Sequence, residues 1–151
     1  MLNETERWKP SVTVAAVVVR ADRYLIVEES IGGRVVLNQP AGHLEPGESL
    51  IEAVKREVLE ETGWIVEPTS LIGVYRHRVD SPEQCLFRFA FAADPLDLDA
   101  GRALDPAILG VRWMSRAEIE AARSSHRTPL VLACLRDYLD GAALPLSCIH
   151  D

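Results

Sequence analysis

The strongest local signal in the sequence is residues 49–62, whose pattern predicts one well-defined helix. Ser49 and Glu52 have the spacing of a capping box, in which each side chain hydrogen-bonds to the backbone N–H of the other at the helix start. Gly63 follows at the position where helices commonly end in a left-handed residue. Apolar side chains recur along the segment with helical spacing, at Leu50, Ile51, Val54 and Val58. They form an apolar stripe on one side of the helix, which the fold must bury.

The same predicted helix carries three carboxylates on one face. Because successive helical residues advance by about 100°, Glu57, Glu60 and Glu61, spaced i, i+3 and i+4, fall within about one third of the circumference. A solvated charged face is the common reason for such a cluster. Glu61, however, continues the apolar register of Ile51, so its carboxylate is aimed at the margin of the core.

A carboxylate at the core margin needs a partner, because burying an unpaired charge is costly. The basic residues close to it in sequence are Lys55 and Arg56, and a single guanidinium cannot neutralise three acids. A hard divalent cation, which prefers carboxylate oxygens, resolves the conflict. The pattern therefore favours a metal-binding helix over a solvated face.

Strands and further helices are predicted on both sides of this helix. A second capping box at Ser115 and Glu118 predicts a helix through about residue 122. Thr128 and Pro129 predict the N-cap and first residue of a last helix toward residue 138. The order predicts an α/β protein with a mixed sheet between helices. Apolar, β-branched segments predict strands at residues 12–19, 24–29, 35–37, 70–79, 84–92 and 111–114.

Two segments rich in proline and glycine are predicted as loops. Residues 39–48 form a tight non-helical segment that leads into the helix and delivers backbone carbonyls to its N-terminal end. Residues 94–105 are predicted to be a loop inside the domain. The sequence has no internal repeat or flexible linker, so we expect a single domain over residues 1–151.

Charge and cysteine content exclude several classes of protein. The formal net charge of −7 argues against a nucleic-acid-binding surface, which clustered lysine and arginine would have to supply. The longest apolar run is too short to cross a bilayer, and the charged first ten residues do not resemble a signal peptide. The three cysteines form no C-x-x-C pair. We expect a cytoplasmic protein that binds no membrane.

The loop and the helix together resemble the Nudix family. Gly42, five residues, Glu48, seven residues and then residues 56–63, R-E-V-L-E-E-T-G, match every fixed position of the family's signature. Trp64 stands where the signature has a bulky aliphatic residue, which affects packing more than chemistry. The resemblance covers about residues 11–140, the core of the expected domain.

The resemblance implies a fold and a chemistry. The fold would be the Nudix α/β/α sandwich with a mixed sheet. Glu57, Glu60 and Glu61, with the carbonyl of Gly42, would hold Mg²⁺ or Mn²⁺. Glu48 and Arg56 would form an ion pair that locks the loop to the helix. Nudix enzymes differ in their general base, so two choices stay open.

The first choice for the residue that orients and deprotonates water is Glu57, and the second is Asp105, in the loop before residues 112–113. Outside the signature, His43, Arg76 and Arg88 are candidate substrate-binding residues. For each of them, a surface or core-edge role is the competing interpretation.

Short segments outside the signature, at residues 8–10, 38–45, 86–89, 112–115 and 127–131, are similar to the NudJ phosphatase branch of the family. That likeness implies release of phosphate from nucleoside di- and triphosphates or from hydroxymethylpyrimidine diphosphate. Hydrolysis of ADP-ribose, an oxidised deoxynucleotide or an RNA 5′ end, and a non-catalytic nucleotide sensor, remain alternatives. A monomer and a homodimer are both compatible with the sequence.

Overall fold

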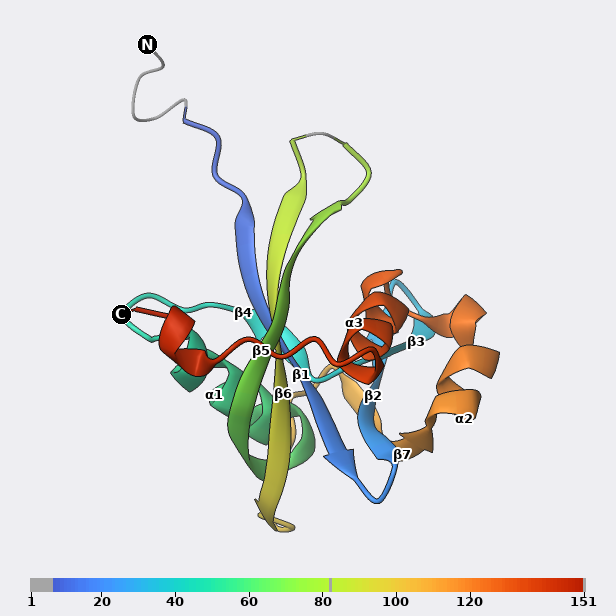
Figure 1. Ribbon diagram of the computed structural model, residues 1–151. Helices are drawn as coiled ribbons and strands as arrows, with labels where there is room; N and C mark the ends of the chain where they lie inside the picture. Colours follow the sequence, from blue (N-terminus) through green and yellow to red (C-terminus); the bar gives the residue numbers. More distant parts are fainter. Residues whose placement is uncertain (1–6, 82, 151) are drawn as a thin grey trace.

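The computed structural model describes residues 7–81 and 83–150, which form a mixed sheet covered by helices on both faces (Figure 1). Its strand order is β3-β2-β1-β6-β5, with β4 paired to β1 and β7 to β2. The strands β1 and β6 are parallel, and the other pairs are antiparallel. The strands are β1 (Ser11–Arg20), β2 (Arg23–Ile31), β3 (Arg34–Asn38), β4 (Ala41–His43), β5 (Trp64–Arg78), β6 (Cys85–Leu98) and β7 (Ile108–Ser115).

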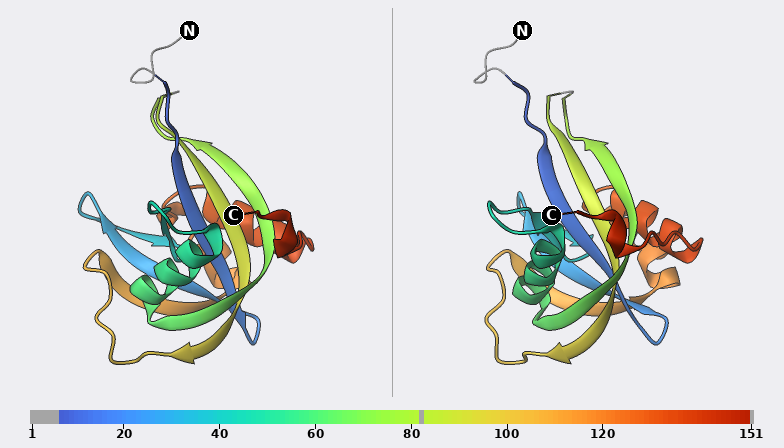
Figure 2. Two further views of the ribbon diagram at one scale, coloured as in Figure 1. Left: turned by 90° about the vertical axis from the view of Figure 1, so that its left-hand side faces the viewer. Right: turned by 60° about the vertical axis from the view of Figure 1, so that its left-hand side comes forward.

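The helices lie on opposite faces of the sheet, as Figure 2 shows by turning the molecule. The helix α1 packs on one face and the helices α2 and α3 on the other. The predicted α/β/α sandwich is therefore confirmed. The helices are α1 (Leu50–Thr62), α2 (Arg116–Ala121) and α3 (Leu130–Leu139), with short 3-10 turns η2 (Arg123–Ser125) and η3 (Leu146–Cys148).

The strand β1 is buried on both faces, which explains its nearly continuous apolar sequence. Val14 and Val18 belong to the apolar cluster under α1, together with Val54 and Val58 of the helix. Val17 points the other way, into the cluster formed with α2 and α3. Alternation along a strand thus supplies side chains to two cores, and β1 is the centre of the molecule.

The caps of α1 and α2 are confirmed. Both capping boxes, Ser49 with Glu52 and Ser115 with Glu118, are complete, and Gly63 ends α1 with a left-handed φ of 76°. The predicted start of the last helix was wrong by one residue. Pro129 is the N-cap of α3, while the Thr128 hydroxyl accepts a hydrogen bond from the N–H of Leu130 at 3.2 Å.

The predicted loop at residues 94–105 was wrong in its first half, because β6 continues to Leu98 and β5 already begins at Trp64. Pro68 and Pro95 look like strand breakers in the sequence. In the structure they pair with Ala93 and Val66 beside register shifts in the ladder, where a missing N–H is tolerated. The loop predicted at residues 39–48 also contains a short strand, β4.

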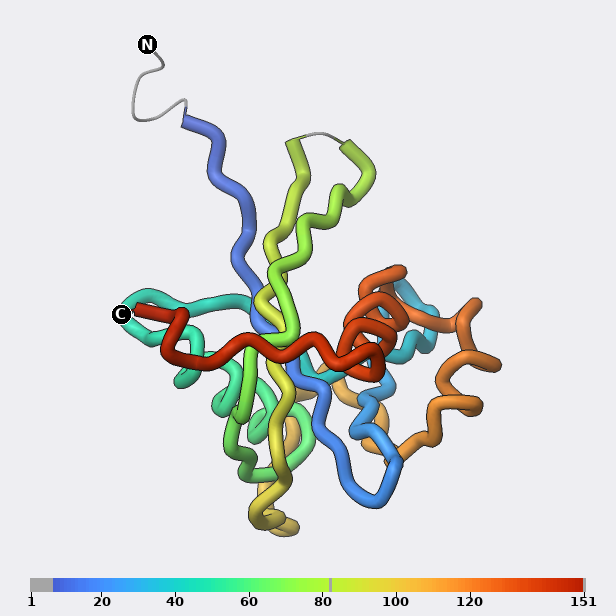
Figure 3. The backbone as a smooth tube through the Cα atoms, viewed as in Figure 1, coloured from blue at the N-terminus to red at the C-terminus, as the bar shows by residue number. Residues whose placement is uncertain are grey.

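The C-terminal segment crosses the outer edge of β5 (Figure 3). The backbones of Leu71 and Leu144 exchange two hydrogen bonds there, of 2.9 and 2.8 Å. Leu146 and Ile149 then pack against the apolar cluster under α1. This segment covers part of an otherwise open sheet edge.

No helix of the described residues is long and apolar enough to span a bilayer. Residues 1–6, part of the charged segment that does not resemble a signal peptide, lie outside those residues. The single-domain organisation and the cytoplasmic location remain predictions.

Candidate active site

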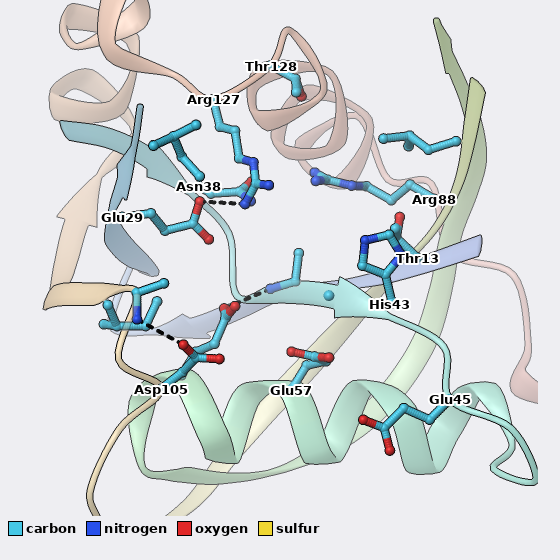
Figure 4. A pocket seen from close by; sticks show the side chains of 17 residues that line it. Thr13, Glu29, Asn38, His43, Glu45, Glu57, Arg88, Asp105, Arg127 and Thr128 are labelled. Atoms are coloured by element: carbon cyan, nitrogen blue, oxygen red, sulfur yellow. Dashed lines mark hydrogen bonds and ion pairs between the residues drawn. The ribbon is translucent and has the colours of Figure 1, made fainter. Parts of the chain in front are cut away.

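A cavity of about 390 Å³ lies between α1, β4 and the residues that precede α3 (Figure 4). The carboxylate of Glu57 enters it from α1, and that of Asp105 enters from the loop before β7 (Figure 4). Glu61 of α1 lines the cavity as well. Arg88 comes from β6 and His43 from the end of β4. The cavity therefore brings together acids and cations that are far apart in the sequence.

Gly42 allows the helix to come close to β4. A Cβ atom at this position would overlap the carboxylate of Glu57. The backbone of Gly42 pairs with Val14 of β1, so the strand cannot simply move aside. Glycine is therefore required for close approach between strand and carboxylate.

Arg56 is the centre of an ion-pair network at the start of the site. Its Nε and Nη2 atoms donate to both carboxylate oxygens of Glu48, at 2.9 and 2.6 Å, which is the pair that the family resemblance implies. Nη2 also donates to the carbonyl of His43 at 3.0 Å. Nη1 donates to Glu57 at 2.8 Å and to Glu60 at 3.2 Å. One guanidinium thus joins the loop before α1 to two acids of the helix.

Glu61 is a buried acid, only 6% exposed, as its place in the apolar register predicts. One carboxylate oxygen accepts a hydrogen bond from the backbone N–H of Ala41 at 3.0 Å. Burial, followed by the nearby charges of Glu29, Glu57 and Asp105, raises the pKa of Glu61 to about 8. A positive charge in the cavity would therefore stabilise the ionised carboxylate.

Burial also raises the pKa of Glu57, although Arg56 opposes the shift. Glu60 is different, because its side chain is 39% exposed and does not line the cavity. Among residues 7–81 and 83–150, no three His, Cys, Asp or Glu side chains stand close enough to hold a metal ion as they are oriented. Glu57 and Glu60 both form ion pairs with Arg56, at 2.8 and 3.2 Å.

The donor set nevertheless fits a hard divalent cation. Glu57 and Glu61 provide carboxylate oxygens to the cavity, and burial raises the pKa of both. Gly42 leaves the space beside Glu57 free of a side chain. Oxygen ligands of this kind suit Mg²⁺ and Mn²⁺.

Two of the three candidate substrate-binding residues lie at the cavity, and the third does not. His43 and Arg88 line the cavity. Arg76 is an exposed residue of β5 and does not line it, so the structure gives no support for Arg76 as a substrate ligand. Asp105, the second choice for the general base, does reach the cavity, and its backbone N–H donates to the carbonyl of Glu60 at 2.9 Å.

Sequence reasoning missed Glu29, Asn38 and Arg127 as site residues, although all three line the cavity. Glu29 is only 3% exposed and forms an ion pair of 2.8 Å with Arg127. A polar residue at an inward-facing strand position was an available signal for Glu29 and Asn38. Arg127 lies in one of the segments that resemble the NudJ branch, but its sequence position did not indicate that the turn before α3 brings it to the cavity.

Replacing Arg56 by alanine is expected to lower both the melting temperature and the affinity for Mg²⁺. The change leaves Glu48 without its bidentate partner and removes the donor that orients Glu57. Loss of a partly buried charge network costs about 1–3 kcal/mol per unpaired group. Thermal unfolding with and without Mg²⁺ measures both effects. If only KM for the substrate rises, Arg56 is a substrate ligand and does not pin the loop.

Comparison with known proteins identifies the class to which this fold and site belong. A family model for the NUDIX domain matches residues 9–133. The structure of a NUDIX hydrolase from Nitrosomonas europaea is similar with a TM-score of 0.92 and 47% identity, over 95% of this chain and 97% of the other. The chain belongs to the Nudix family and is a hydrolase that acts on phosphoanhydrides.

Within the family, the chain is similar to the Phosphatase NudJ of Escherichia coli strain K12. The two are 42% identical over 145 residues, which cover 95% of this chain and 93% of the relative. The predicted likeness to the NudJ branch is thus confirmed. A bifunctional NMN adenylyltransferase/ADP ribose pyrophosphatase from Francisella tularensis, solved with AMP and a Mn ion, shares the fold at 20% identity and a TM-score of 0.72, over 91% of this chain and 43% of the other.

Proposed function

We propose that the protein is a Mg²⁺- or Mn²⁺-dependent pyrophosphohydrolase that releases phosphate from nucleoside di- and triphosphates or from a hydroxymethylpyrimidine-type diphosphate. The observation that carries the metal dependence is the buried carboxylate of Glu61 with the partly buried carboxylate of Glu57, beside a glycine whose Cβ would collide with Glu57. The identity to a phosphatase over nearly the whole chain supports the release of phosphate. Substrates would be small molecules, bound by a monomer or a homodimer.

The proposed metal ligands are Glu57, Glu60 and Glu61 with the carbonyl of Gly42. Glu61 is already fixed by the N–H of Ala41. Glu60 would have to turn from Arg56 toward the cavity, which its partial exposure allows. The bidentate ion pair of Glu48 with Arg56 would keep the loop attached to α1 when the Glu60 side chain turns.

A bound divalent cation would neutralise diphosphate oxygens and lower the pKa of water in the cavity. Glu57 is the first choice for accepting the proton from water, because burial raises the pKa of its carboxyl and thereby makes it a stronger base. Arg56 donates to one oxygen of Glu57 at 2.8 Å and so orients the carboxylate. Asp105, held by the N–H of Ala107 at 2.9 Å, remains the second choice.

Phosphate release is expected to stop in excess EDTA, and the apparent affinity for Mg²⁺ is expected to rise between about pH 6 and about pH 9. The pKa of Glu61 is raised to about 8 without metal, so below that pH a cation must displace a proton from the carboxyl. Mg²⁺ titrations of the initial rate at several pH values measure this. Full turnover in EDTA would exclude the proposed ligands.

The bond that is cleaved can be identified by incubating the protein with GTP, GDP and hydroxymethylpyrimidine diphosphate and assaying phosphate without an auxiliary pyrophosphatase. Attack at the terminal phosphorus releases phosphate directly from each of them. Triphosphates that yield only a monophosphate and pyrophosphate would contradict the proposal. Cleavage of ADP-ribose alone, or of RNA 5′ ends alone, would place the chain in another branch of the family.

A further inference from the structure

Arg88 is a buried cation without a neutralising partner. It is 4% exposed, and its Nε and Nη1 atoms form no hydrogen bond within the described part of the chain. The acid whose charge reaches it, Glu29, is already paired with Arg127 at 2.8 Å. The thiol of Cys134 beside it stays neutral, because burial raises the pKa of that thiol to about 11. Such a guanidinium indicates a ligand that supplies hydrogen-bond acceptors.

Two acceptors accompany Arg88 on the wall of the cavity that faces α1. Asn38 is 1% exposed, and its Oδ1 atom has no hydrogen-bond partner among the described residues. The buried carboxylate of Glu29 lines the same cavity. In the view of Figure 4, Glu29, Asn38 and Arg88 follow one another along this wall, opposite Glu57 of the helix.

A phosphate satisfies only part of this wall. It offers acceptors to Arg88 but no donor to Asn38 Oδ1, which would stay without a hydrogen bond. A planar base edge can instead present an acceptor at one end and donors at the other. Leu86 and Ile108 line the cavity as well and provide apolar contact for a ring.

We infer that this wall selects the base of the substrate, and that the preferred base carries a carbonyl, a ring N–H and an amino group next to one another along one edge, as guanine does. The carbonyl accepts from Arg88, and the ring N–H and the amino group donate to Asn38 and Glu29. The diphosphate then extends toward Glu57 and Glu61. The inference rests on the proposed function, since it names the nucleotide that the same site hydrolyses in preference.

A series of diphosphates tests the inference on the unmodified protein. We expect kcat/KM for phosphate release to be at least about 10-fold higher for GDP than for ADP, with IDP, which lacks the amino group, in between. Equal values for GDP, ADP and the base-free ribose 5-diphosphate would overturn base selection while leaving the hydrolase intact. Absence of phosphate from all of them would instead contradict the proposed function. In that case calorimetry with GMP and AMP still tests the wall, because GMP is expected to bind more tightly and equal affinities would overturn the inference.

The contribution of Arg88 is tested with Arg88→Met, which keeps most of the side-chain length and removes the donors. The ratio of kcat/KM for GDP to that for ADP is expected to fall to about 1. Arg34→Met, at the exposed start of the strand that carries Asn38, is the matched control and should keep the wild-type ratio. An unchanged ratio in a folded Arg88→Met protein would overturn the assignment. If circular dichroism shows that this variant does not fold, Asn38→Leu and the wild-type series decide the question.

Discussion

Replacement of Glu61 by glutamine is expected to lower kcat by at least about 100-fold and, at the same time, to raise the melting temperature of the metal-free protein at alkaline pH. The loss of activity follows from the loss of a proposed metal ligand. Glutamine still offers an oxygen to the N–H of Ala41, so the local backbone should keep its hydrogen bond. A variant that is more stable but inactive would show that the Glu61 carboxylate serves catalysis at the expense of stability.

The direction of the stability change follows from the pKa of Glu61, which burial raises from its ordinary value of 4.5 to about 8. The stability contributed by the protonated carboxyl is complete below about pH 4.5 and is lost as the pH rises through about 8. Glutamine cannot ionise and keeps that stability at about pH 9. Each kcal/mol corresponds to roughly 2–4 °C in a chain of this size.

The measurement is a pair of assays, initial rates with Mg²⁺ and thermal unfolding in EDTA at about pH 6 and about pH 9. Glu67→Gln removes an exposed carboxylate that pairs with Lys55 on the surface, and it should change neither quantity much. Near-wild-type rates in Glu61→Gln would show that the acid is no metal ligand. A melting temperature below that of wild type at about pH 9 would show that its ionised form stabilises the fold.

Replacement of Gly42 by alanine is expected to reduce kcat/KM by about 100-fold or more, because the new methyl group occupies the place of the Glu57 carboxylate. The strand cannot retreat without breaking its pairing with β1, so the carboxylate must turn away. Initial rates and Mn²⁺ binding followed by electron paramagnetic resonance measure the effect.

Gly101→Ala is the matched control for this change, since a Cβ there meets no atom within 4 Å and the variant should behave as wild type. The double variant Gly42→Ala with Glu57→Gln adds a further check. If the methyl group acts by displacing Glu57, the double variant should be little worse than either single variant. Additive losses, or wild-type activity in Gly42→Ala, would contradict the close approach of strand and carboxylate.

Local sequence patterns predicted the elements that depend on local physics. The two capping boxes and the left-handed Gly63 are satisfied within a few residues of backbone, and they appeared where their spacing placed them. The burial of Glu61 could also be predicted, because helical periodicity fixes which side of α1 it occupies. The parts that failed, residues 94–98 and 64–69, form strands through pairing with one another. Their prolines suggest loops locally, and only the partner strand reveals that they are tolerated.

The sequence by itself determined the family, the helix and the face on which its acids lie, because the signature and the helical period are local properties of the chain. The tertiary structure decided which side chains complete the cavity. Glu29, Asn38, Arg88 and Arg127 come from β2, β3, β6 and the turn before α3, and no spacing in the sequence relates them. It also separated Arg88 from Arg76, although both are arginines on neighbouring strands. Burial and neighbouring charges depend on how strands pair and helices pack, so the fold had to be known before these residues could be assigned.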